Sequence, residues 1–256
     1  MGEERFISVQ ELADNLESFV LVDCDTAEAY HRFHLPGAFL APCRYWKGGG
    51  TDDGVHAIDD PALLSALLSK LGLSENSQVV GYDGCGGLNA ARLGWTLERF
   101  GFQRFQVLDG GPENWYQAGL ELTLKPPNPV VSSVSFQGPS MESFCSMSEL
   151  VKLPSTTVLW DNRSPQEWRG GRIPGATFLP WDTLLESSGL LLPREHLERL
   201  LEESGLFKTR EIVIYCAGGI RAAHSYWVLK SLGYKSVRVY DGSWSEYQRS
   251  GLPVEV

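Results

Sequence analysis

The chain contains an internal duplication, and this feature constrains its fold more than any other. Five segments of the first half recur in the same order in the second half. The pairs are ISVQEL 7–12 with CSMSEL 145–150, LVDCD 21–25 with LWDNR 159–163, HLPGA 34–38 with RIPGA 172–176, GGLNAARLGWTLERFGF 86–102 with GGIRAAHSYWVLKSLGY 218–234, and LDGGPENW 108–115 with VYDGSWSEY 239–247. So many matches in one order predict two tandem copies of a single folding unit.

Each copy alternates helical and strand patterns. Ser8/Glu11 and Ser146/Glu149 are capping boxes that start a helix. The segments 61–73 and 194–206 carry apolar residues at helical spacing and end near a glycine. Short apolar strands between such helices predict an α/β fold with two tandem domains, each a mainly parallel sheet flanked by helices.

The expected domain limits follow the repeat. The first domain spans residues 1–122 and the second spans residues 143–256. Between them, residues 123–142 are rich in Pro and Ser and lack a helical pattern, which predicts an extended linker. The two halves can bury faces against each other, and we therefore expect a monomer.

Composition and charge exclude several classes of function. Of the 256 residues, 43% are hydrophobic and 21% charged, which is typical of a globular protein. The net charge of −10 excludes a nucleic-acid partner, because a phosphate backbone requires a positive surface. The apolar runs are too short to cross a membrane, and the N-terminal stretch lacks the apolar core of a signal peptide. We expect a cytoplasmic protein, with a mitochondrial location as the alternative.

The five cysteines do not form a disulfide or metal pattern. They stand at positions 24, 43, 85, 145 and 216, and no two of them are spaced as CxxC. An odd, scattered set predicts free thiols in a reducing compartment. His31 and His34 have no companion pair of ligands, so we expect neither a metal nor another cofactor.

Cys216 stands in a setting that a structural cysteine does not need. It follows the apolar run IVIY, and Ala217, Gly218 and Gly219 lead from it into a helix. Glycines let the backbone curl so that several N–H groups converge on the sulfur, and those donors with the positive end of the helix favour a thiolate. The same cradle can hold an anionic substrate, and Arg221 adds a positive charge.

These residues carry a family resemblance. The chain resembles the two-domain rhodanese-type sulfurtransferases over nearly its whole length, through LWDNR with RIPGA, the loop CAGGIR and the terminal YDGSWSEY. The resemblance implies that Cys216 takes sulfane sulfur from a small anionic donor as a persulfide and passes it to cyanide, a small thiol or a thiol protein. It further implies that Ala217, Gly218, Gly219, Ile220 and Arg221 surround the persulfide, and that Arg163 and Arg169 face the donor's anionic end.

The first half lacks this nucleophile. Asp83 stands where the second half has Cys216, the loop is one residue longer, and Asp25 stands where the second half has Arg163. A carboxylate cannot attack sulfur, so we predict that the first domain is non-catalytic. Cys85 lies in the same loop and is a candidate for a second reactive thiol, although an ordinary loop cysteine is the simpler interpretation.

The sulfur donor and the reaction class have alternatives. Arg221 favours the compact dianion thiosulfate, whereas the small neutral Ala217 and Gly218 favour 3-mercaptopyruvate. A cysteine-dependent phosphatase or arsenate reductase is a second reaction class to consider, although those enzymes use C-x5-R and this loop is C-x4-R. A third alternative is a non-catalytic scaffold that keeps only the fold.

Overall fold

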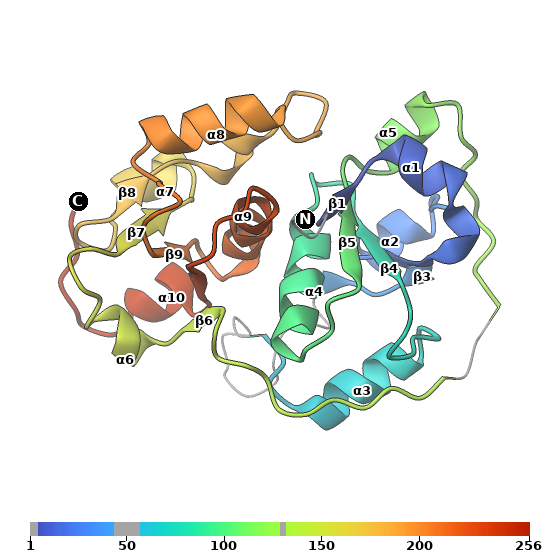
Figure 1. Cartoon of the computed structure of the whole chain (residues 1–256), viewed down its shortest axis with the longest axis horizontal. Coiled ribbons are helices and arrows are strands. Elements are labelled where there is room, and N and C mark those ends of the chain that lie inside the picture. The colour runs from blue at the N-terminus through green and yellow to red at the C-terminus, as the bar shows by residue number, and fades with distance from the viewer. Residues whose placement is uncertain (1–4, 44–56, 129–131) are drawn as a thin grey trace.

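The structure is a computed structural model that describes residues 5–43, 57–128 and 132–256. It contains two parallel five-stranded sheets, one in each half (Figure 1). In the first sheet the order is β1-β5-β4-β2-β3, and in the second it is β6-β10-β9-β7-β8. Since every strand pair is parallel and helices flank both sheets, the predicted fold class is confirmed.

The strands of the two sheets correspond one to one. The first sheet consists of β1 (Phe6–Ile7), β2 (Val20–Asp23), β3 (Phe39–Leu40), β4 (Val79–Tyr82) and β5 (Phe105–Leu108). The second consists of β6 (Phe144–Cys145), β7 (Val158–Asp161), β8 (Thr177–Phe178), β9 (Ile212–Tyr215) and β10 (Val237–Tyr240). The central strands β4 and β9 are buried along their whole length, as expected for parallel strands covered on both faces.

The helices also repeat. The first half contains α1 (Val9–Asp14), α2 (Ala27–Tyr30), α3 (Pro61–Ser69), α4 (Leu88–Arg99) and α5 (Pro112–Gln117), with the 3-10 helix η1 (Leu16–Ser18). The second half contains α6 (Met147–Leu150), α7 (Pro165–Arg169), α8 (Arg194–Glu203), α9 (Ile220–Ser231) and α10 (Ser243–Tyr247), with η3 (Trp181–Leu184). Ser146 and Glu149 form the capping box that the sequence predicts at the start of α6.

The two halves pack against each other through α4 and α9, which lie side by side at the centre of the molecule (Figure 1). Both helices are largely buried, and one apolar core extends across both halves. Trp227 of α9 donates its indole N–H to the carbonyl of Arg5 at 2.8 Å, which ties the second half to the N-terminal end of the first half, just before β1.

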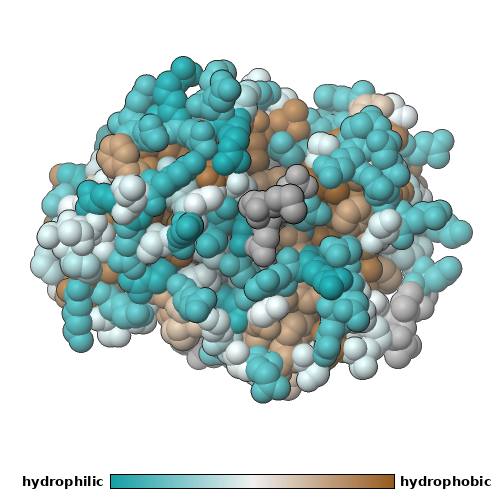
Figure 2. Space-filling view, in the orientation of Figure 1, coloured by the Kyte–Doolittle hydropathy of each residue, from teal (hydrophilic) through white to brown (hydrophobic). Residues whose placement is uncertain are grey.

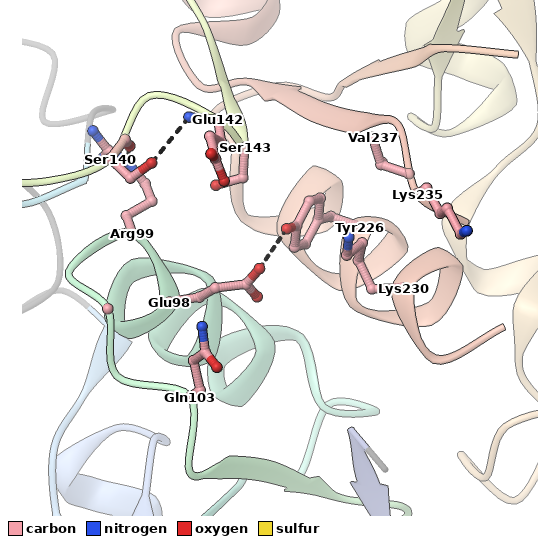
Figure 3. Close-up of a pocket in the computed structure, with 11 residues that line it drawn as sticks. Glu98, Arg99, Gln103, Ser140, Glu142, Ser143, Tyr226, Lys230, Lys235 and Val237 are labelled. Carbon is pink, nitrogen blue, oxygen red and sulfur yellow. Dashed lines mark hydrogen bonds between the residues drawn. The ribbon is translucent and has the colours of Figure 1, made fainter. Parts of the chain in front are cut away.

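A polar cavity of about 260 Å³ opens between the halves (Figure 3). Tyr226 of α9 reaches across it and donates its hydroxyl to Glu98 of α4 at 2.7 Å. The residues that line this cavity do not include any from the loop that begins at Cys216. It is therefore part of the contact between the halves rather than of the loop at Cys216.

The segment that connects the halves lies against the first half. Ser132 donates its hydroxyl to the carbonyl of Leu73 at 2.6 Å, and Val134 is buried. Phe136 packs edge-on against Phe100 and Phe102. The connector is thus attached along the first half, and it does not act as a free spacer.

The outer surface is mostly hydrophilic in the view of Figure 2, with apolar side chains between the polar ones. Among the residues that the structure describes, no helix is both long and apolar enough to cross a membrane.

Candidate active site

Cys216 lies directly after β9 and before α9, at the carboxyl edge of the second sheet. Ligands of parallel α/β folds bind at this edge, where strands end and helices begin. The residue is 1% exposed, and its Sγ accepts a hydrogen bond from the N–H of Gly219 at 3.1 Å. A backbone donor aimed at the sulfur stabilises negative charge there.

Gly219 is required by the shape of this loop. Its φ is +82°, in the left-handed region that side chains disfavour. A Cβ at this position would overlap Oδ1 of Asp241 and lie 2.7 Å from Nη1 of Arg92. Only glycine lets the backbone come this close to the two charged groups while directing its N–H at Cys216.

Ser243 is a further member of the site, and it was not among the residues predicted from the sequence. Its hydroxyl oxygen accepts from the N–H groups of Cys216 and Gly219, each at 3.1 Å, and lies 3.9 Å from Sγ of Cys216. Its φ is +51°, the only positive value outside glycine among the described residues. Such strain is typical of functional sites, because the surrounding structure must hold it in place. The motif YDGSWSEY contained this signal.

Arg221 lies at the start of α9 and is held by Glu167 of α7. The two side chains form a bidentate pair at 2.7 and 2.8 Å. This pair lowers the pKa of Glu167 to about 2. Glu167 also raises the pKa of Arg221, to which the neighbouring Cys216 sulfur contributes. Arg221 is thus a fixed cation beside the sulfur, and Glu167 is a partner that was not predicted from the sequence.

Arg163 lies deeper in the fold than its sequence position suggested. Its side chain is 1% exposed and pairs with the carboxylate of Asp161 at 2.6 Å. It also donates to the carbonyl of Gly171 at 2.7 Å, and its guanidinium lies 4.5 Å from the ring centroid of Trp244. Tyr215, the last residue of β9, donates to the same Asp161 carboxylate at 2.6 Å. Arg163 therefore stabilises the end of β9 through Asp161.

The remaining predicted residues lie at the rim. Three loop residues are partly exposed: Ala217, Gly218 and Ile220. The sulfur of Cys216 is buried at the base of the loop. The N–H of Ser245 donates to the carbonyl of Ala217 at 2.9 Å, which ties the loop to α10. Arg169 is exposed at the end of α7.

The equivalent loop of the first half is filled by its own carboxylate. Asp83 accepts hydrogen bonds of 2.7 to 2.9 Å from the N–H groups of Cys85, Gly87, Asn89 and Ala90. The cradle that would hold an anion is therefore occupied by a side chain of the protein itself.

Three of the other cysteines have a raised pKa. Burial and the neighbouring Asp83 carboxylate raise the pKa of the Cys85 thiol well above its usual range. Burial raises the pKa of Cys145 to about 12, and that of Cys24 is raised for the same reason. Within the described residues, no group of three or more His, Cys, Asp or Glu side chains could hold a metal ion.

Comparison with known proteins places this duplicated fold. The family of rhodanese-like domains matches residues 8–118 and again residues 146–250. The chain belongs to the rhodanese-like domain family. The two matched ranges contain the two halves of the repeat, with Asp83 in the first and Cys216 in the second.

Several relatives align with this rhodanese-like chain over most of its length. A putative thiosulfate sulfurtransferase of Mycobacterium bovis is 31% identical, over 93% of this chain and 91% of its own. A thiosulfate sulfurtransferase of Azotobacter vinelandii is 33% identical, over 93% and 91%. A solved 3-mercaptopyruvate sulfotransferase of Escherichia coli superposes with a TM-score of 0.82 at 22% identity, covering 95% of this chain and 100% of its own, and so shares the fold.

Proposed function

We propose that the protein is a sulfurtransferase in which Cys216 carries sulfane sulfur as a persulfide. The relatives named thiosulfate sulfurtransferase, at 31% and 33% identity over most of the chain, support this reaction class. The observation that carries the proposal is the Gly219 N–H on Cys216 Sγ at 3.1 Å, in a loop that Arg221 borders. A cysteine held this way is a nucleophile in an anion-binding loop.

The first half-reaction transfers sulfur to the enzyme. The Cys216 thiolate attacks the outer sulfur of thiosulfate, an S–S bond forms, and the donor's S–S bond breaks with its electron pair leaving on sulfite. The products are the Cys216 persulfide anion and sulfite, and no proton or external reductant is needed. We propose that the loop N–H groups of residues 217–221 surround the new outer sulfur, as the Gly219 N–H on Sγ supports.

The second half-reaction returns the enzyme to its thiolate. Cyanide attacks the outer sulfur of the persulfide, its carbon forms the new C–S bond, and the electron pair of the S–S bond returns to Cys216. A small thiol or a protein thiol accepts the sulfur in the same way. Because the two steps are separated by a covalent intermediate, the proposal predicts ping-pong kinetics.

Thiosulfate is the donor that the site favours. Arg221 supplies a fixed cation beside the sulfur, which suits a compact dianion. The exposed Arg169 is a further cation that faces the donor in this proposal. Arg163 instead stabilises Asp161 and the end of β9. 3-Mercaptopyruvate is the second candidate, because Ala217 and Gly218 leave the rim of the loop small and uncharged.

The proposal extends to the state in which the protein works. We propose a monomer, since α4 and α9 already cover each other between the halves. We take residues 1–122 as the non-catalytic domain and residues 143–256 as the catalytic domain, joined by the linker 123–142. Transfer requires a reduced Cys216, so the proposed compartment is a reducing one such as the cytosol.

A turnover assay tests this function. Wild-type protein should form thiocyanate from cyanide with thiosulfate, and more slowly with 3-mercaptopyruvate, whereas Cys216→Ser should form none with either donor. Cys85→Ser is the matched control and should retain full turnover. Hydrolysis of a phosphate ester by wild type, without thiocyanate formation, would overturn the proposal in favour of a phosphatase.

A further inference from the structure

One helix side chain from each half lies next to the loop of the other half. In the repeat, Arg92 of α4 is equivalent to His224 of α9, and the left-handed Gly87 is equivalent to Gly219. A Cβ on Gly219 would lie 2.7 Å from Arg92, and a Cβ on Gly87 would lie 3.9 Å from His224. Each half therefore places a helix residue against the glycine of the other half's loop.

Arg92 is fixed by an ion pair that crosses between the halves. Its Nη1 contacts Oδ1 of Asp241 at 2.5 Å, and both side chains are 1% exposed. The other oxygen of Asp241 accepts from the N–H of Ala57 at 2.8 Å. Asp241 follows β10 in the second half, so groups of the first half hold both of its carboxylate oxygens.

This ion pair lies next to Gly219, the residue whose N–H donates to the Cys216 sulfur. Oδ1 of Asp241 and Nη1 of Arg92 both lie within 3 Å of the position that a Cβ on Gly219 would take. The N–H of Gly219 donates to Cys216 Sγ. Any displacement of the pair would move the Gly219 donor, and any imbalance in its charge would act on the nearby sulfur.

The opposite contact lacks this charge. His224 is fully buried, and neither ring nitrogen has a well-formed hydrogen bond to a described residue. Burial lowers its pKa to about 4, so the ring is neutral near pH 7. The loop that His224 contacts has Asp83 at the position that Cys216 occupies in the other loop. The charged Arg92 thus lies next to the loop that contains Cys216, and the neutral His224 lies next to the loop that contains Asp83.

We propose that Arg92, supplied by the non-catalytic half, is a positioning residue of the sulfur site: it neutralises Asp241 and holds the Gly219 N–H on Cys216. This inference rests on the proposed function, whereas its test, the alkylation of Cys216, does not require sulfur transfer. It explains what the first half contributes to the reaction although its own loop is filled by Asp83.

The charges around the loop make the effect of each substitution directional. Two ion pairs border the loop: Arg221 with Glu167, and Asp241 with Arg92. Arg99 also lies near enough to interact with Asp241. Removing Arg92 takes away one positive charge that contacts the Asp241 carboxylate near the sulfur, which opposes the thiolate. Removing the charge of Asp241 leaves the guanidinium, which favours the thiolate.

The test is the pH dependence of iodoacetamide alkylation at Cys216, followed by mass spectrometry of its peptide in the full chain. Arg92→Met should move the midpoint to higher pH by about one unit and slow alkylation about tenfold at neutral pH. Asp241→Asn should move it to lower pH. The double variant R92M/D241N should return toward wild type, and Arg92→Lys should stay close to wild type.

His224→Phe is the matched control, because it changes the equivalent helix position behind the other loop, and its profile should match that of wild type. Shifts of Arg92→Met and Asp241→Asn in the same direction, or no shift in either, would overturn the inference and leave Arg92 a merely structural residue. Thermal unfolding of each variant identifies any that fail to fold, and the double and Lys variants then decide. Alkylation that behaves as predicted in a protein that takes no sulfur from any donor would count against the proposed function alone.

Discussion

Asp83 and Cys216 occupy the same place in the two halves, each at the carboxyl end of a central buried strand and each held by the loop that follows it. Four backbone N–H groups donate to the Asp83 carboxylate, and the N–H of Gly219 donates to Cys216 Sγ. The first half therefore shows the loop closed on an anion that the protein carries itself. In the second half the equivalent loop surrounds the sulfur atom of Cys216 instead.

Asp83→Ala should destabilise the protein without removing its chemistry. The substitution leaves four N–H donors around an empty position, and we expect a loss of about 3 kcal/mol in the free energy of unfolding. Asp25→Ala is the control, because it removes one bond, to the N–H of Gly84, and should cost about 1 kcal/mol. Urea unfolding measures both. Equal losses would contradict the role of Asp83 as the internal anion.

Gly219→Ala should abolish transfer. The new methyl group would overlap Asp241 and Arg92, and the left-handed backbone would be strained. Gly205→Ala is the control for backbone strain alone, because Gly205 has φ +78° with no atom within 4 Å of the position that a Cβ would take. We expect Gly205→Ala to cost about 1 kcal/mol and keep full turnover. Normal turnover in Gly219→Ala would show that the loop tolerates a displaced donor.

Arg221→Met should separate the two sulfur donors. Loss of the cation beside Cys216 should raise KM for thiosulfate about tenfold, while KM for 3-mercaptopyruvate changes by less than about threefold. Arg199→Met, on the outer helix α8, is the control and should change neither constant. If both donors lose affinity equally, Arg221 acts on the sulfur nucleophile rather than on the donor.

His224 should make the protein sensitive to acid. Burial lowers its pKa to about 4 in the folded state, from 6.5 for an exposed ring. The unfolded chain therefore binds the proton first as pH falls, and stability is lost between pH 6.5 and 4, by about 3 kcal/mol in all. His224→Phe removes this component. Unfolding curves of wild type and variant at neutral pH and near the folded-state pKa give the difference, and parallel losses in the two proteins would contradict it.

The order of the elements could be predicted from the sequence because the duplication supplied two copies of each signal. Helices 61–73 and 194–206 have clear apolar periods, and both are present as α3 and α8. The strands β1 and β6, which begin each half, were not predicted. Each is two residues long, too short for an alternating pattern to be visible, and each is defined only by pairing with β5 or β10 from the far end of the same half.

Within the site, the sequence identified what lies within one segment and missed what comes from another. Cys216 and its loop are contiguous, so their geometry followed from strand, glycine and helix signals. Glu167 reaches Arg221, and Ser243 reaches Cys216, only through the packing of separate elements. Arg163 could not be placed because a charged residue after a strand can face a ligand or an internal carboxylate, and here its partner is Asp161, on the same strand end.

The most direct test of the sulfur-carrying role is the intact mass of the protein after incubation with thiosulfate. Wild type should gain one sulfur atom, cyanide should remove it, and Cys85→Ser should behave in the same way. Cys216→Ser should gain nothing. A sulfur that is gained by Cys216→Ser as readily as by wild type, or no gain in folded wild type with either thiosulfate or 3-mercaptopyruvate, would contradict the account.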